Sequence, residues 1–315
     1  MAATDVSRVQ RHRALDRSVE RSAVAALVPV LALVPVWLLA LAVFWWPLHQ
    51  VWRISFTTFA LVHLAGVVVM FWRPLQTLVV MRMLGARRAT PDQAQRLEPA
   101  WRSVAQQLGI RPRRYALAVL PSDELNAFAC GGSLLVVTAY AIDTLPRDEM
   151  TGVLAHELAH HLGFHTVALS LRQWLSLPIF LLARIGFFLQ NVAAAATASF
   201  VSHSTALSFL GRLIASVLNA VSWLFLSALL ASNSIANRVG KRSEFEADSR
   251  AVAMGFGREL ATALRRVELD NSARGDAAGL SLRDTLVVTH PSPRSRVSRI
   301  EALRRREAER LRFSR

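Results

Sequence analysis

The chain has a single cysteine, Cys130, among its 315 residues. An intrachain disulfide is therefore impossible, and so is a zinc site built from several cysteines. Acidic residues are also scarce, with 22 Asp and Glu against 37 Lys and Arg, and Lys241 is the only lysine. Such a basic excess is typical of proteins that contact nucleic acid or a membrane surface. No nucleic-acid-binding motif is recognisable, so a lipid bilayer is the favoured partner.

Apolar sequence is abundant, since 53% of the residues are hydrophobic. Four runs predict transmembrane helices, because about 20 apolar residues cross the hydrocarbon core. We expect Arg172 to reach the membrane interface and Arg184, which is deeper, to face protein or water. A buried hairpin in a soluble domain is the alternative for the last two runs. The four runs are residues 22–46, 54–72, 167–189 and 213–231.

The Lys and Arg residues flank these runs unevenly. They gather before the first run, after the second and after the fourth, whereas Arg53 alone separates the first two. Because cytoplasmic flanks are enriched in Lys and Arg, both termini and both large polar regions are predicted to lie in the cytoplasm. The expected location is the plasma (inner) membrane.

The same runs divide the chain. We expect a cytoplasmic segment, a transmembrane hairpin, the first part of a polar domain, a second hairpin and the second part of that domain. The two polar parts must fold together around the inserted hairpin. The expected bounds are 1–21, 22–72, 73–165, 166–231 and 232–315.

The polar parts predict helices and a small sheet. Residues 91–110 have helical spacing, with Leu97, Trp101, Val104 and Leu108 on one face and Gly109 as a stop. Strands are predicted in "RRYALAVL" and on both sides of the glycine pair in "NAFACGGSLLVVTAY". Further helices are expected at 145–162, with Pro146 in the first turn, and at 244–254 and 295–312.

The helix expected at 145–162 contains "HELAH". His156 and His160 are four residues apart, so they share a helix face and can bind one Zn²⁺. Glu157 can act as the general base on a water molecule at that metal. His161 points away from this face by roughly 100°, and His165 falls past the helix end. Both are expected to be supporting or surface groups.

A catalytic zinc takes three protein ligands and keeps one position open. The third ligand must come from elsewhere in the chain. The segment "SEFEAD" offers three carboxylates, Glu244, Glu246 and Asp248, within five residues. From the residues alone, a solvated acidic helix is the alternative.

Several segments together resemble one family. The chain has "LNAFACGGSLLVVT", then "VLAHELAHH", then "SEFEAD" after a hydrophobic hairpin, then "THPSPRSRVSRI". This series is similar to the HtpX-type membrane-embedded zinc metalloproteases, bacterial relatives of the CAAX prenyl protease. The resemblance covers roughly residues 22–303, and it includes the order of spans and motifs.

The resemblance implies a role for each matched residue. It makes His156, His160 and Glu244 the zinc ligands and Glu157 the base, with Asp248 supporting the ligands. Asn126 and His290 would line the substrate cleft and stabilise the transition state. Cys130 departs from the family, which commonly has a larger residue there, so no functional thiol is implied.

We therefore expect a mainly α membrane protein with four transmembrane helices and an α+β, zincin-like catalytic domain. An edge strand of its small sheet should lie beside the HExxH helix and bind extended peptide. The expected substrates are misfolded or membrane-associated proteins. Two other functions stay open, a sensor-transducer protease that acts on a regulator and a non-enzymatic zinc-containing membrane scaffold. The oligomeric state cannot be read from the sequence.

Overall fold

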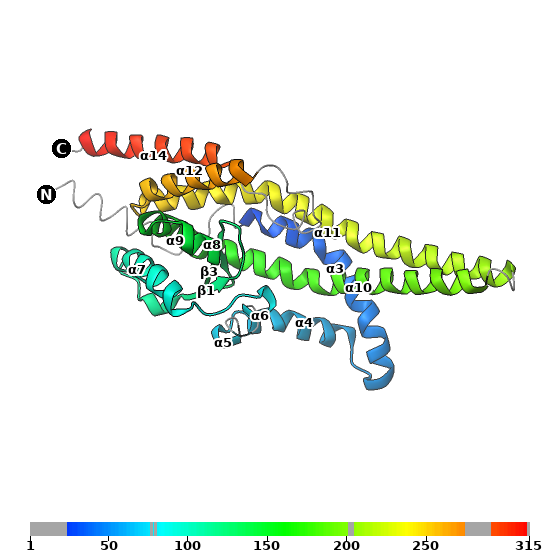
Figure 1. Ribbon diagram of the computed structural model, residues 1–315. Coiled ribbons are helices and arrows are strands. Elements are labelled where there is room, and N and C mark those ends of the chain that lie inside the picture. Colours follow the sequence, from blue (N-terminus) through cyan, green and yellow to red (C-terminus); the bar gives the residue numbers. More distant parts are fainter. Residues whose placement is uncertain (1–23, 76–77, 79–80, 201–204, 275–290, 314–315) are drawn as a thin grey trace. The chain divides into compact units, whose positions relative to one another are not determined.

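The computed structural model describes residues 24–75, 78, 81–200, 205–274 and 291–313 (Figure 1). The described chain is mostly helical and has one small sheet. It divides into two compact units. One unit, Leu27–Val67 and Leu171–Ala236, is called the membrane unit. The other comprises residues 24–26, Val68–Ser170 and Asn237–Arg315 as far as these are described, and it is called the catalytic unit after the role expected from the sequence.

Three helices of the described chain are long and apolar enough to cross a membrane. The longest two are α10, of about 54 Å, and α11, of about 74 Å, at 1.5 Å per residue. Both contribute residues to both units. The three helices are α3 (Leu27–Trp52), α10 (His165–Phe200) and α11 (Thr205–Ala253).

The second predicted span differs from the other three. Only α4 (Phe56–Met70) is helical there, and its 15 residues reach about 22 Å. A hydrocarbon core is about 30 Å thick, so α4 is short for a full crossing. Arg53, with a positive φ of 50°, ends the preceding helix and begins the turn into α4. A fourth complete span therefore stays a prediction.

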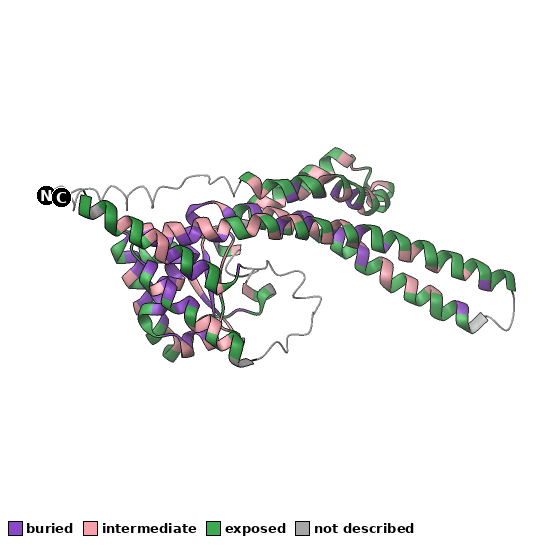
Figure 2. Ribbon diagram, turned by 90° about the horizontal axis from the view of Figure 1, so that it is seen from above, coloured by how far each residue is buried: buried purple, intermediate pink, exposed green. Residues whose placement is uncertain are grey.

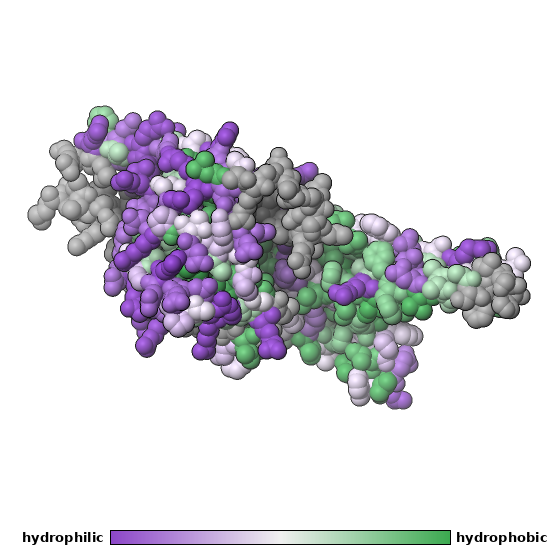
Figure 3. All heavy atoms as spheres, in the orientation of Figure 1, coloured by the Kyte–Doolittle hydropathy of each residue, from purple (hydrophilic) through white to green (hydrophobic). Residues whose placement is uncertain are grey.

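The surface of the membrane unit is apolar. Large hydrophobic side chains such as Leu31, Val62 and Phe188 are more than half exposed, as expected for helices that face lipid. Figure 2 shows exposed residues along α10 and α11, and Figure 3 shows hydrophobic side chains gathered over these helices. A smaller buried core, which includes Leu33, Trp37 and Phe225, packs the helices against one another.

Polar side chains are buried between helices of the membrane unit. Arg172 of α10 donates a hydrogen bond to Asn233 of α11, so this cation contacts protein. Arg184, in contrast, is exposed on the surface of α10. Of the two expected surroundings, protein and water, burial against protein is therefore not seen within the described part of this chain, and contact with water stays a prediction.

The catalytic unit packs its helices around one large core. That core includes Leu97, Trp101 and Val104 from the face predicted for residues 91–110, and Gly109 adopts a φ of 64° beyond the helix end. Its helices are α7 (Pro91–Gln107), α8 (Ala139–Thr144), α9 (Arg147–Leu162), α12 (Gly257–Arg274) and α14 (Pro293–Phe313), with the short α5 (Arg73–Leu75), α6 (Met81–Leu84) and a 3-10 turn at Pro112–Arg114.

The sheet has three strands in the order β1-β3-β2. The outer strand β1 (Ala116–Leu120) is parallel to β3 (Leu134–Thr138), and β2 (Ala127–Cys130) is antiparallel to it. The predicted pair of strands is confirmed. Gly131, with a φ of 60°, makes the turn between them. β2 forms one edge of the sheet, as predicted.

Two helix boundaries differ from the predictions. Pro146 is the N-cap of α9 rather than part of its first turn. The helix predicted at 244–254 is the last part of α11, which continues without a break from the fourth apolar run. The segment that carries the acidic residues is therefore an extension of a long apolar helix.

Candidate metal centre

Helix α9 carries His156 and His160 on one buried face. Asp148 and Glu149 lie in its first turn, where their negative charges interact favourably with the positive end of the helix dipole. Glu149 is also held by two hydrogen bonds from Arg266 of α12, at 2.6 and 2.9 Å. These contacts fix the helix that presents both imidazoles.

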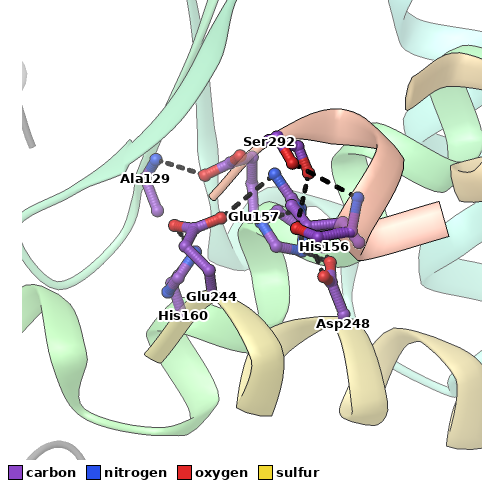
Figure 4. A network of polar contacts seen from close by, with 9 residues as sticks. Ala129, His156, Glu157, His160, Glu244, Asp248 and Ser292 are labelled. Carbon is purple, nitrogen blue, oxygen red and sulfur yellow. Dashed lines mark hydrogen bonds and ion pairs between the residues drawn. The ribbon is translucent and has the colours of Figure 1, made fainter. Parts of the chain in front are cut away.

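Helix α11 brings a carboxylate to these imidazoles from far along the chain. Glu244 lies 3.3 Å from Nε2 of His156 through one oxygen and 3.3 Å from Nε2 of His160 through the other. One ligand atom from each of the three residues falls within 4.8 Å of the others. Figure 4 shows these side chains of α9 and α11 turned toward one another. The structure thus brings together the three predicted ligands.

Asp248 lies one helical turn beyond Glu244 and is fully buried. Its Oδ1 is 3.1 Å from Nδ1 of His156, on the side of the ring away from Glu244. A carboxylate in this position fixes the tautomer and the orientation of a ligating imidazole. This contact agrees with the supporting role that the family resemblance implied for Asp248.

The surroundings of His156 favour positive charge. Burial and the nearby Arg296 lower the pKa of this histidine, but hydrogen bonds to Asp248 and Glu244 outweigh them and raise its pKa to about 9. The two carboxylates therefore favour the protonated form of this histidine.

Arg296 of α14 is the member of the site that sequence reasoning missed. Its side chain is only 8% exposed. Nη1 lies 3.1 Å from Glu244, and Nε and Nη2 donate to the two oxygens of Asp248 at 2.9 and 2.7 Å. Arg296 lies in the quoted segment "THPSPRSRVSRI", but this segment contains several arginines. No spacing rule indicates which of them is buried at the site.

Glu157 is directed toward the sheet rather than toward Glu244. Its Oε2 accepts a hydrogen bond of 2.8 Å from the backbone N–H of Ala129 in β2. Figure 4 shows this contact between α9 and the strand. The carboxylate of Glu157 therefore lies between the His156–His160–Glu244 cluster and the edge strand.

The remaining residues that the sequence singled out have different positions in the structure. Asn126, exposed beside β2, lines the same cavity as His156 and Glu157. His290 lies outside the described residues. His161 and His165 are both 3% exposed, so neither is a surface group, and of the two expected roles only that of a supporting group stays open. His161 contacts the carbonyl of Leu134 at 3.1 Å, because α9 packs against the sheet on that side.

The donor set fits a zinc ion. Two imidazoles and one carboxylate are the three protein ligands found in one common type of catalytic zinc site, which leaves a position open for water. His156 and Glu244 are buried, and His160 is nearly so. The contact of Asp248 with His156 has the geometry of the supporting carboxylate that such sites use.

This arrangement places the chain among the membrane metalloproteases. Within that class it belongs to peptidase family M48, whose profile matches residues 91–306. The matched region contains α9, the acidic end of α11 and most of α14.

The individual relatives share a low sequence identity with the chain, but their matches cover more than half of it. The chain is 28% identical over 258 residues to an HtpX protease homolog of Acidiphilium cryptum, covering 75% of this chain and 83% of the relative. It is 30% identical over 197 residues to one of Neisseria meningitidis, covering 59% and 66%. A solved structure, Ste24p of S. mikatae, has a TM-score of 0.49 and 17% identity, covering 83% of this chain and 62% of that one.

Proposed function

We propose that the protein is a zinc endopeptidase of the plasma (inner) membrane with its catalytic unit in the cytoplasm. Its substrates are unfolded or membrane-associated proteins. The observation that carries this proposal is the position of Glu157 between the His156–His160–Glu244 cluster and the edge strand β2. A general base there lies beside both the metal site and the path of a bound peptide.

Each residue of the site has its own role in the proposed reaction. His156, His160 and Glu244 would hold zinc, which when bound polarises a carbonyl and acidifies water. Glu157 takes a proton from the attacking water and delivers it to the leaving amine. Asp248 and Arg296 hold His156 and Glu244 in position. Asn126 and His290 are proposed to stabilise the developing oxyanion.

The edge strand supports a preference for extended substrates. β3 pairs with one side of β2, and a peptide can pair with the other side by adding a strand. There it would compete with Glu157 for the backbone N–H of Ala129. Main-chain pairing is tolerant of side chains but requires an extended backbone. Unfolded segments meet this requirement, whereas stable helices do not.

The proposed cytoplasmic location of the catalytic unit is supported by the distribution of positively charged residues along the chain. The arginines that flank the predicted spans favour a cytoplasmic position for both polar regions.

Casein hydrolysis by the purified full-length protein in detergent tests the proposal. Wild-type protein with zinc should degrade casein, and Glu157→Gln should keep its zinc but lose activity by at least about 100-fold. Glu246→Gln is the matched control, since Glu246 is partly exposed on α11 and pairs with Arg242. It should retain activity. Zinc-loaded wild type that never cleaves would instead favour the scaffold function.

A further inference from the structure

A cavity of about 380 Å³ opens beside the metal centre, within the catalytic unit. His156 and Glu157 form part of its wall, and Asn126 and Ala127 at the start of β2 form another part. The cavity therefore adjoins both the proposed base and the strand on which a peptide would lie. Pockets of 300–1,000 Å³ are typical of specific ligand sites.

The far wall of the cavity is apolar. Val153 of α9 and Leu260, Leu264 and Val267 of α12 line it. Gly152 brings the two helices close together, because a Cβ atom there would lie 2.3 Å from the backbone nitrogen of Leu260. This close approach leaves little freedom for the wall to adjust to different side chains.

The rim of the cavity is acidic. Glu124, which is exposed, and Asp270 of α12 both line it. Asp270 is held in place by a hydrogen bond of 2.8 Å from the hydroxyl of Tyr140. Among the described residues that line the cavity, Arg296 is the only arginine, and it is already bound to Asp248 and Glu244.

We infer that this cavity receives one substrate side chain next to the scissile bond, that it selects large apolar side chains and that it excludes acidic ones. The inference rests on the proposed function and adds a specificity to it. An aromatic or leucine side chain would bury its surface against Leu260, Leu264 and Val267. A carboxylate would lose its water and meet the charges of Glu124 and Asp270.

A mixture of synthetic peptides, with cleavage sites identified by mass spectrometry, tests the inference on the full-length protein in detergent with zinc. One position beside the scissile bond should favour Phe, Leu or Met over Ala by about 10–100-fold, the usual range for apolar pockets. Asp and Glu should be nearly absent at that position.

Two substitutions should change this preference in different directions. Val267→Trp fills the cavity from a half-buried position, so small residues should become the preferred ones. Glu124→Lys reverses a charge on the exposed rim, so peptides with Asp or Glu at that position should be cleaved at least about 10-fold faster. Leu269→Ala is the control, because Leu269 lies on α12 but is 71% exposed. It should leave the preference unchanged.

The outcomes separate this inference from the proposed function. Cleavage that depends on Glu157 but shows no side-chain preference, or a preference that Val267→Trp and Glu124→Lys leave unaltered, would overturn the inference and keep the peptidase. A misfolded variant cannot imitate the gain expected for Glu124→Lys. If no cleavage depends on Glu157, the proposed function fails and the inference fails with it.

Discussion

Arg296 binds Asp248 through two parallel hydrogen bonds, Nε to Oδ2 at 2.9 Å and Nη2 to Oδ1 at 2.7 Å. Both side chains are buried, and the same aspartate contacts His156. The pair therefore joins α14 to α11 directly behind a proposed zinc ligand. Burial raises the pKa of Asp248, but its hydrogen bonds with His156 and Arg296 outweigh this effect and lower it.

Removing this guanidinium should affect stability and metal binding together. Arg296→Ala leaves the buried carboxylates of Asp248 and Glu244 without their cation, which should lower the free energy of unfolding by about 3–5 kcal/mol. Zinc affinity should fall by about 10–100-fold, as for other residues that orient ligands. Thermal unfolding and zinc titration of the purified protein measure the two effects.

Arg294→Ala is the control for that substitution. Arg294 lies on the same helix, but its side chain is 84% exposed and its partner is Glu268. Its loss should change neither the unfolding temperature nor zinc affinity appreciably. Equal effects from the two substitutions would show that Arg296 has no particular role at the site.

The third ligand is predicted to be Glu244 rather than Glu246. Residues four apart share a helix face, so a ligand at Glu244 places Asp248 beside the imidazoles. A ligand at Glu246 would place Arg250 there, and a guanidinium cannot accept a hydrogen bond from a ligating imidazole. Glu244→Ala should lose most bound zinc, Asp248→Ala should weaken binding by about 10–100-fold, and Glu246→Ala should leave it nearly intact. Zinc analysis of the three purified variants decides this, and the reverse order would reassign the ligand.

Local patterns in the sequence predicted much of the site. The four-residue spacing of His156 and His160 defines one helix face, and the acidic segment contains Glu244 and Asp248 on another. Helical periodicity also identified the buried face of α7. In each case the signal lies within about two helical turns, where backbone geometry fixes which side chains are neighbours.

Contacts between distant segments were harder to predict. Arg296 meets Asp248 from 48 residues away, and Ala129 meets Glu157 from 28 residues away. Neither contact has a spacing signature, because tertiary packing alone brings the partners together. The burial of His161 was missed for the same reason, since its partner is a backbone carbonyl of β3.

The topology has a direct test. The arginine distribution predicts that both termini lie in the cytoplasm, so the chain should reach the other side after Gln50 and again after Ala198. Reporter fusions at these two positions should show an external location, and a fusion at the C-terminus should show an internal one. A cytoplasmic signal after Gln50 would indicate that α3 and the shorter α4 do not form a spanning hairpin.

Zinc binding should depend on pH through His156. Its pKa of about 9 means that, without metal, this imidazole carries a proton at neutral pH. Zinc needs the lone pair that the proton occupies, so binding must displace the proton. Apparent affinity should therefore rise about tenfold for each unit of pH increase below 9. Chelator competition at pH 7 and pH 8, corrected for the chelator's own protonation, measures this change.

Asp248→Asn provides the matching comparison for the pH series. The substitution removes one of the two carboxylates that raise the pKa of His156, so a larger share of this histidine should be neutral at pH 7. The dependence of zinc affinity on pH between 7 and 8 should then shrink, although binding itself is weaker. An equally steep dependence in Asp248→Asn would mean that another group releases the proton, and a flat one in the wild type would mean that His156 is already neutral.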